Sequence, residues 1–240
     1  MPYKGKRIAV VMPAYNAAKT LRATYEDLPL DIVDVVILVD DASVDNTVDI
    51  AKTLPIIVDQ HSINRGYGGN QKTCYARALN EGADIIVMVH PDHQYDPTMI
   101  PEMIRIMVDS EYWAVFGSRM MKREHALAGG MPRWKYMFNI LLTQIGNRVL
   151  GTHLTELHSG FRAYDRRVFD AISIDRNSDN FIFDTQIIIQ LVQEGIAIKE
   201  IPIATRYFPE ASQIRLKACI RYGCGILYNL FLYKAGLRKY

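Results

Sequence analysis

The stretch Ile8-Ala9-Val10-Val11-Met12 decides the fold class, and it runs directly into Pro13-Ala14-Tyr15-Asn16. Its continuous apolar character is typical of a strand buried on both faces, as in a parallel sheet covered by helices. Similar short apolar runs occur at residues 35–39, 56–59, 85–89 and 113–117, and helical patterns separate them. This alternation predicts an α/β layer with a mostly parallel central sheet.

Four segments around this layer matter for a site. Residues 64–70, NRGYGGN, predict a glycine-rich loop before a helix at 71–81. Residues 120–132 predict a loop over the site, and residues 134–150 predict a long helix. The sequence from Ser212 onward is also predicted to be helical.

Composition narrows the class of protein. Apolar residues make up 49% and charged residues 22% of the 240 positions, which is typical of a globular domain. A net charge of +2 gives no argument for a nucleic-acid partner. Three cysteines without zinc-binding spacing favour a reducing compartment. Because no run reaches the roughly 18 apolar residues of a spanning helix, we expect the protein on the cytoplasmic side.

Polar side chains gather where the predicted strands end. They follow four separate strands and are Tyr15, Asn16, Asp40, Asp41, Asp92 and Arg119. Ligands of open α/β sheets bind beyond the carboxyl ends of the strands, so these residues predict one shared site.

Two of these strand ends carry carboxylates. Asp40 and Asp41 could contact a nucleobase, a ribose or a cation, and the alternative is that one of them only caps the next helix. Asp92, with Gln94, offers oxygen ligands for Mg²⁺ or Mn²⁺. His90 would add a nitrogen ligand that favours Mn²⁺, unless this segment is simply a turn around its prolines.

Glycines and arginines suggest where anions could bind. Gly66 lies in the glycine-rich segment, where the backbone can approach a ligand and a helix N-terminus attracts anions. A flexible connection is the alternative reading. Arg119, Arg133 and Arg162 lie at predicted element ends and could grip phosphate, although surface arginines are usually only solvated.

From about Ile8 to Tyr207, the chain resembles family 2 glycosyltransferases, and most closely the branch of dolichol- or polyprenyl-phosphate mannosyl and glucosyl transferases. The matching stretches, in order, are VMPAYN at 11–16, VDDAS at 39–43 with Asp45 and Thr47, the loop from Asn64, DHQ at 92–94 with Pro97, GSR at 117–119, SGFR at 159–162 and EIPI at 200–203.

The resemblance implies a GT-A fold, with a mixed, mostly parallel sheet flanked by helices. It implies that Pro13, Tyr15 and Asp41 hold the nucleoside and that Asp92 binds the metal beside Gln94. From their own positions in the sequence, Asn16, Asp40 and Gly66 are also expected to bind the nucleotide. Arg119 and Arg133 would meet the acceptor phosphate, while Ser159 and Arg162 would shape the acceptor side. The reaction would invert the anomeric centre by direct displacement. Asp184 would serve as the base if the acceptor were a hydroxyl.

The chain departs from the family pattern at two positions. His90-Pro91-Asp92 stands where the family usually has Asp-x-Asp, which leaves the metal site without its first carboxylate. Glu156 stands where the branch often has an aspartate. Both departures bear on the expected metal and acceptor sites.

The C-terminal region is expected to differ from the rest. We divide the chain into a GT-A catalytic domain at 1–210 and an amphipathic helical tail at 211–240. Basic residues flank apolar ones in the tail, as in helices that lie in a membrane interface. The alternative is that this helix packs on the catalytic core or on a second subunit of a homodimer. The expected location is peripheral, at the cytoplasmic face of a membrane.

Together these features predict an inverting glycosyltransferase that uses Mn²⁺ or Mg²⁺. It would move a hexose from a GDP-mannose or UDP-glucose type of donor to a polyprenyl or dolichyl phosphate. A glycan or other hydroxyl acceptor is the first alternative, and a non-catalytic sugar-nucleotide-binding protein is the second. A sugar nucleotidyltransferase is weaker, since the glycine-rich segment lies far from the N-terminus.

Overall fold

The computed structural model describes residues 3–206 and 216–237. Within these ranges the centre of the molecule is a seven-stranded sheet in the order β3-β2-β1-β4-β6-β5-β7. The strands are β1 (Ile8–Ala14), β2 (Val35–Asp40), β3 (Ile57–Gln60), β4 (Ile85–Met88), β5 (Ala114–Ser118), β6 (Arg162–Asp165) and β7 (Ile198–Pro202). The predicted mixed, mostly parallel α/β fold is therefore confirmed.

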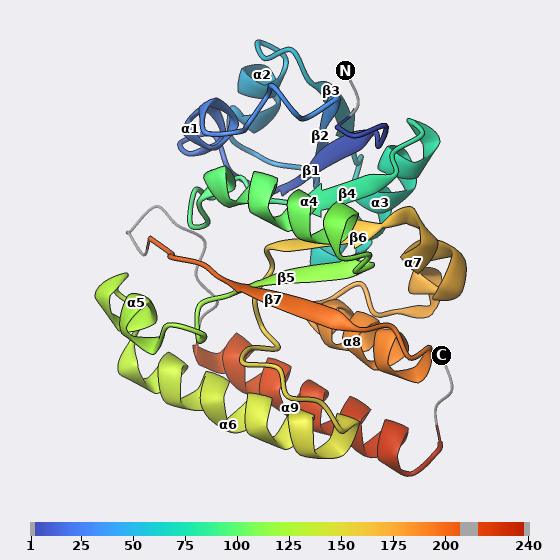
Figure 1. The fold of residues 1–240 in the computed structure, drawn as a ribbon. Helices are drawn as coiled ribbons and strands as arrows, with labels where there is room; N and C mark the ends of the chain where they lie inside the picture. The colour runs from blue at the N-terminus through green and yellow to red at the C-terminus, as the bar shows by residue number, and fades with distance from the viewer. Residues whose placement is uncertain (1–2, 207–215, 238–240) are drawn as a thin grey trace.

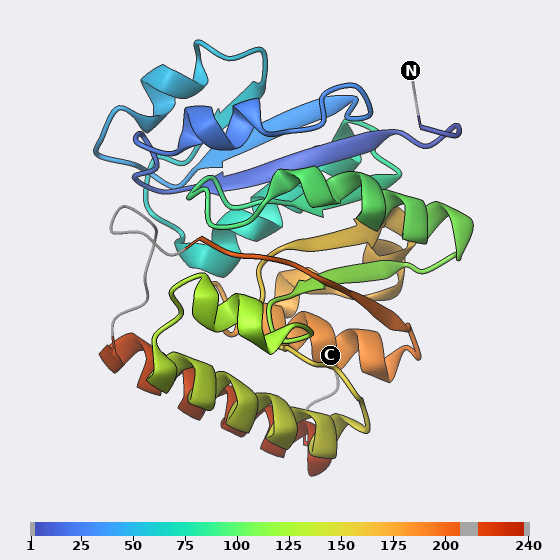
Figure 2. The same ribbon diagram turned by 60° about the vertical axis from the view of Figure 1, so that its left-hand side comes forward.

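Helices cover both faces of this sheet (Figures 1 and 2). The described helices are α1 (Leu21–Glu26), α2 (Thr47–Ala51), α3 (Gly66–Asn80), α4 (Ile100–Asp109) after the 3-10 turn η1 (Pro97–Met99), α5 (Arg123–Ala128), α6 (Arg133–Leu150), α7 (Arg166–Ala171), the 3-10 turn η2 (Ile174–Arg176), α8 (Phe183–Gln193) and α9 (Leu216–Lys234). Along β1, Val10 and Met12 pack with α1 and α4, whereas Ala9 and Val11 pack with α3 and α8. Alternate residues thus enter two separate cores, as the apolar run of β1 requires.

Strand β6 runs against its neighbours. It pairs antiparallel with both β4 and β5, while β5 and β7 are parallel. The start of β6 therefore lies at the edge where the parallel strands end, and the turn at 158–161 reaches the same edge as Asp41 and Asp92. This reversal brings a segment from late in the chain to the predicted site.

The glycine-rich segment is not the loop expected from the sequence. Helix α3 begins at Gly66, five residues before the predicted start at Gln71. A Cβ on Gly68 would lie 2.3 Å from the carbonyl oxygen of Ser178, so glycine at this position lets the 178–180 segment pack directly on the helix. The backbone N–H of Gly68 donates to the carbonyl of Asp179 at 2.8 Å. The glycines therefore serve close packing as well as the turn.

Other predicted elements hold with modest changes. Residues 120–132, expected to be a loop, contain the short helix α5. Helix α6 matches the predicted long helix, beginning at Arg133. The predicted helical tail corresponds to α9, and the expected domain boundary after residue 210 lies outside the described residues.

Helix α9 packs on the catalytic layer. It lies beside α6 (Figures 1 and 2), and its Ile226 and Leu230 are 0% and 1% exposed in the same core as α3 and α8. A buried amide pair joins it to α8, since Gln186 Nε2 donates to Asn229 Oδ1 at 3.0 Å. No helix within 3–206 or 216–237 is long and apolar enough to cross a bilayer. One face of α9 is thus packed in the core of the described residues.

Ile226→Ala is expected to lower the free energy of unfolding by about 2–5 kcal/mol, because it removes buried methyl groups and leaves a cavity. Leu227→Ala is the matched control, since Leu227 is 42% exposed on the same helix. It should change the free energy of unfolding by about 0.5 kcal/mol or less. Urea denaturation followed by circular dichroism measures both variants. Equal and small effects would contradict the packing of α9 on the core.

Candidate active site

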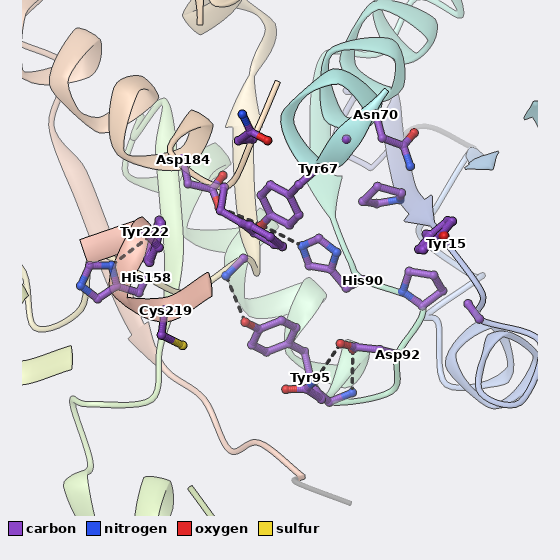
Figure 3. Close-up of a pocket in the computed structure, with 18 of the residues that line it drawn as sticks. Tyr15, Tyr67, Asn70, His90, Asp92, Tyr95, His158, Asp184, Cys219 and Tyr222 are labelled. Carbon is purple, nitrogen blue, oxygen red and sulfur yellow. Dashed lines mark hydrogen bonds between the residues drawn. The ribbon is translucent and has the colours of Figure 1, made fainter. Parts of the chain in front are cut away.

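A cavity of about 630 Å³ lies at the edge where the parallel strands end. Figure 3 shows Tyr15 and Asn70 at one end, Tyr222 and Cys219 at the other, and His90 with Asp92 between them. The first end is formed by the strand ends and is largely polar. The second lies between α6 and α9, where its lining includes the apolar side chains of Met131, Trp134, Phe138 and Leu142. The cavity therefore joins a polar half to a half that we call apolar for these four side chains, although Lys135 and Asn139 of α6 line it as well.

Asp41 lines the polar half and is 3% exposed. Its Oδ1 accepts hydrogen bonds from His61 Nδ1 and from the backbone N–H of Arg65, both at 2.8 Å. Its Oδ2 accepts from the N–H of Gly66 at 2.9 Å. The carboxylate thus occupies the N-terminus of α3, and the anion site expected at Gly66 is filled by the protein itself. Gly66 still lines the cavity.

Asp40 has a structural position. It is fully buried, and its Oδ2 accepts from the backbone N–H of Ser43 at 2.9 Å, so it shapes the turn after β2. Asp40 is not among the described residues that line the cavity, and its expected contact with a nucleotide stays a prediction. Alternation along the chain places the side chains of consecutive residues on different sides, and here the second aspartate faces the site.

Pro13, Tyr15 and Asn16 line the cavity as expected. The ring of Tyr15 is 55% exposed, which suits stacking against a planar base. Asn16 has a left-handed φ of 52°, and its Oδ1 accepts from the N–H of Val44 at 3.0 Å. Its own N–H donates to Ser43 Oγ at 2.8 Å. These bonds join the segments that follow β1 and β2.

Asp92 and Gln94 form one unit in the cavity. The Asp92 carboxylate accepts from the Gln94 backbone N–H at 3.1 Å and from its side-chain amide at 2.7 Å. Burial raises the pKa of Asp92 above its usual value, and the nearby His90 partly offsets this rise. The Asp92 carboxylate is therefore partly desolvated, and a bound cation would stabilise its charge.

The chain supplies few ligands for a divalent cation. Among the described residues, no group of three or more His, Cys, Asp or Glu side chains could hold a metal ion. The available set is one carboxylate, one amide and the imidazole of His90, whereas hard cations take about six ligands. This set fits a cation whose remaining ligands come from a diphosphate and water.

His90 contacts the hydroxyl of Tyr67. Its Nε2 lies 3.2 Å from Tyr67 Oη, and the two rings stack with centroids 5.4 Å apart. Tyr67 in turn donates to Asp184 Oδ2 at 2.8 Å. Burial lowers the pKa of His90, which keeps the imidazole neutral at neutral pH. Tyr67 was missed in the sequence because the surrounding glycines indicated a loop.

Asp184 lines the cavity, but protein donors surround its carboxylate. Besides Tyr67, Gln71 Nε2 approaches Oδ1 at 3.4 Å, and Arg162 Nη1 lies 3.6 Å from the same oxygen. Arg162 is 1% exposed and donates to the backbone carbonyls of Ser159 and Leu157. Ser159 and Arg162 are thus buried and are not among the described lining residues, so their expected role on the acceptor side stays a prediction.

Arg119 lines the cavity and pairs with Glu156. Its Nε donates to Glu156 Oε1 at 2.8 Å, its backbone N–H donates to Oε2 at 2.8 Å, and Asn139 Nδ2 donates to Oε1 at 2.7 Å. Burial acts to raise the pKa of Glu156, but Arg119 outweighs it and holds that pKa below its usual value. Glu156, which stands where the branch often has the shorter aspartate, thus holds Arg119 at the cavity wall by hydrogen bonds.

Arg133 is exposed at the start of α6 and is not among the described lining residues. The expected pair of Arg119 and Arg133 is therefore not brought together inside the cavity. The next residues of α6, Trp134 and Lys135, do line it, together with Phe138 one turn further. Their spacing along a predicted helix was the signal that could have identified them.

His158 also lines the cavity, with Nδ1 3.1 Å from the hydroxyl of Tyr222. Burial lowers the pKa of His158 from 6.5 to about 4, despite the opposing charge of Glu156. Below pH about 6.5, His158 binds a proton in the unfolded chain but remains neutral in the folded protein. Stability from this group is therefore complete above that pH and is lost as the pH falls toward 4.

His158→Gln is expected to flatten the fall in unfolding free energy between about pH 6.5 and 4.5, because glutamine does not titrate. The full contribution of one such group is about 1.4 kcal/mol per pH unit. Gln144→Asn, an exposed substitution on α6, is the control and should leave the slope unchanged because neither side chain titrates. Chemical denaturation across this pH range measures both. An unchanged slope in His158→Gln would show that His158 is not buried in its neutral form.

Comparison with known proteins identifies the family of the chain. A family model described as glycosyl transferase family 2 matches residues 9–173. An uncharacterized protein of Methanocaldococcus jannaschii is 33% identical over 95% of this chain and 92% of its own. A UDP-N-acetylglucosamine–dolichyl-phosphate N-acetylglucosaminyltransferase of Methanococcus voltae is 29% identical, over 96% and 97%. An undecaprenyl-phosphate mannosyltransferase of Micrococcus luteus is 27% identical over 82% of each chain.

The fold is likewise shared with solved structures. A crystal structure of glucosyl-3-phosphoglycerate synthase from Mycobacterium tuberculosis, in complex with Mn²⁺, UDP and phosphoglyceric acid, superposes with a TM-score of 0.75. The similarity covers 98% of this chain and 81% of that one at 16% identity, so it concerns the fold alone. With the family model covering most of the sheet and the strand-end site, the chain belongs to glycosyl transferase family 2 and has the GT-A fold.

Proposed function

We propose that this glycosyltransferase moves a hexose from a nucleoside diphosphate sugar to a polyprenyl phosphate, with inversion at the anomeric centre. The observation that carries this proposal is the single cavity in which a polar strand-end half continues into an apolar half between α6 and α9. A water-soluble donor and a lipid acceptor need two such environments beside each other.

The donor is proposed to occupy the polar half. Tyr15 and Pro13 would contact the base, and Asp41 with Asn16 would define the ribose end through the segments that they join. Asp92, Gln94 and His90 would hold Mn²⁺ or Mg²⁺. When bound, the cation would neutralise the charge that develops on the leaving diphosphate. The limited set of protein ligands supports a cation that binds together with the nucleotide.

The acceptor phosphate is proposed to lie near Arg119 and Lys135, with Arg133 at the outer end of α6. A phosphate is already anionic, so its attack depends on positioning and charge rather than on a base. The prenyl chain would contact Trp134, Phe138 and Leu142, and each Å² of buried apolar surface would contribute about 25 cal/mol. The names of the Methanococcus voltae and Micrococcus luteus relatives, which specify lipid phosphates, support this acceptor class.

A hydroxyl acceptor is less well supported. It would need a base, and Asp184 is the carboxylate expected for that role. The hydroxyl of Tyr67 already donates to Asp184 Oδ2, and Arg162 lies beside Oδ1. The donor is of the GDP-mannose or UDP-glucose type, so both its hexose and its nucleobase are left open.

The outer face of α6 and α9 is proposed to lie on the membrane that carries the lipid acceptor. Exposed apolar side chains on this face include Met137 and Leu141 of α6, and Ile220, Leu227 and Phe231 of α9. Exposed basic residues border it at Arg133, Arg148, Arg221 and Lys234. Apolar residues with basic neighbours suit an anionic lipid interface, at about 1 kcal/mol per basic residue close to the surface.

Asp92→Asn is expected to abolish the stabilisation that Mn²⁺ adds to a bound nucleotide, because it removes the anionic ligand. Wild-type protein should melt at a higher temperature with UDP or GDP, and higher again with Mn²⁺. A ligand at 100 times its Kd adds about 2.7 kcal/mol. Asp109→Asn, which changes an exposed carboxylate paired with Lys4, is the control. The donor proposal fails if no nucleotide raises the melting temperature, and the metal role of Asp92 fails if Asp92→Asn keeps the Mn²⁺ effect.

The double variant Leu227→Glu/Phe231→Glu is expected to bind vesicles containing anionic lipid at least about 10-fold more weakly, because it places charge on the apolar face. Transfer to polyprenyl phosphate in vesicles should fall in parallel, while transfer in detergent is retained. Leu30→Glu, at a side chain that is 46% exposed and lies before β2, is the control. Co-sedimentation with vesicles measures the binding.

Unchanged vesicle binding in the double variant would contradict the membrane role of this face. A wild-type dimer that the double variant converts to a monomer would instead assign the face to a second copy of the chain.

A further inference from the structure

The imidazole of His90 is held on one side by a hydrogen-bonded chain that the transfer reaction described above does not use. Tyr67 Oη lies between His90 Nε2, at 3.2 Å, and Asp184 Oδ2, at 2.8 Å (Figure 3). Asp184 is itself fixed by Gln71 and Arg162. This series of hydrogen bonds therefore begins at the buried Arg162 and ends on Nε2 of His90.

The donor and acceptor roles along this series of hydrogen bonds follow from counting protons. A tyrosine hydroxyl carries one hydrogen, and here it donates to the carboxylate of Asp184. Toward His90 the same oxygen can only accept, so Nε2 must carry the imidazole proton. In a neutral imidazole the other nitrogen, Nδ1, is then a lone-pair donor. Within the described part of the chain, Nδ1 makes no hydrogen bond, and His90 lines the cavity.

The surrounding packing holds the ring in one orientation. Tyr67 stacks on the imidazole with an interplanar angle of 19°, and Phe181 packs against Tyr67 with ring centroids 4.7 Å apart. A Cβ on Gly160 would lie 2.7 Å from His90 Nε2, so the turn before β6 presses directly on the ring. The imidazole has contacts on several sides, and its Nε2 face is closed by protein.

We propose that Tyr67 and Asp184 are positioning residues that set the tautomer of His90, so that Nδ1 takes the place of the first carboxylate missing from the metal site. This inference rests on the proposed function, because it requires that a divalent cation binds with the donor. Asp184 then acts through Tyr67 on the histidine rather than as a base. The partner that orients a metal-binding imidazole commonly changes metal affinity by about 10–100-fold.

A nitrogen ligand has a consequence for metal selectivity. Imidazole suits Mn²⁺ and later transition metals better than Mg²⁺, which prefers oxygen ligands. The site should therefore prefer Mn²⁺ to Mg²⁺ more strongly than a site with two carboxylates. The preference should depend on the Tyr67 hydroxyl, because that hydroxyl keeps the proton on Nε2.

The test uses Tyr67→Phe, which removes the hydroxyl and keeps the stacked ring. Mn²⁺ binding to the protein–nucleotide complex is measured by electron paramagnetic resonance of free Mn²⁺, with UDP and GDP as probes and Mg²⁺ as competitor. We expect Tyr67→Phe to weaken Mn²⁺ binding by about 10-fold and to reduce the preference for Mn²⁺ over Mg²⁺. Tyr112→Phe, which removes a hydroxyl from a partly buried tyrosine of the other core that does not line the cavity, should leave the preference unchanged.

The His90→Asp variant separates positioning from a general structural effect. It restores a carboxylate, so the preference for Mn²⁺ should fall, and adding Tyr67→Phe to it should have no further effect. Electron spin echo measurements should detect a ¹⁴N nucleus coupled to Mn²⁺ in the wild type and lose it in His90→Asp.

Two outcomes would overturn the proposal, and they are distinguishable. If the wild type with nucleotide binds no Mn²⁺, the metal-dependent function and this inference fail together. If the wild type binds Mn²⁺ but Tyr67→Phe keeps its affinity and selectivity, or weakens binding equally in the His90→Asp background, only the role of Tyr67 fails.

Discussion

The site depends on one buried carboxylate. Asp41 accepts hydrogen bonds from His61 and from the backbone N–H groups of Arg65 and Gly66, and so joins the end of β2 to the start of α3. A charge at 3% exposure is costly to bury unless such donors surround it. Satisfying Asp41 therefore requires α3 to begin at Gly66, and this start places Tyr67 one residue later, facing the cavity. The proposed nucleoside end and the proposed metal end of the site therefore both contact the start of this helix.

A second constraint lies in the sheet. Because β6 runs antiparallel between β4 and β5, the turn at 158–161 reaches the ends of the parallel strands. Its Gly160 packs on His90, and Arg162 behind it holds Asp184. Ser159 and Arg162, which were expected to shape the acceptor side, are buried in and next to this turn. We propose that α6 and α9 form the acceptor half, since both helices line the cavity and also carry exposed apolar side chains.

The sequence was sufficient for features set by local pattern. The continuous apolar run of β1 predicted a doubly covered strand, and the rule that ligands bind at strand ends brought Tyr15, Asn16, Asp41 and Asp92 to one cavity. It failed where contacts distant in the chain decide the outcome. The start of α3 depends on Asp41, 24 and 25 residues earlier, so the glycine-rich segment resembled a loop. Similarly, no local signal shows that Arg162 points into the core.

The central claim is that one cavity joins a sugar nucleotide to a lipid phosphate. Mass spectrometry of the products formed by the purified full chain, given Mn²⁺, a nucleoside diphosphate hexose and an equimolar mixture of polyprenyl phosphate and a glycan, tests it most directly. The account predicts a hexosyl polyprenyl phosphate, linked through the phosphate oxygen, and no change in the glycan. Hexose added to a glycan hydroxyl, or no transfer despite tight nucleotide binding, would contradict it.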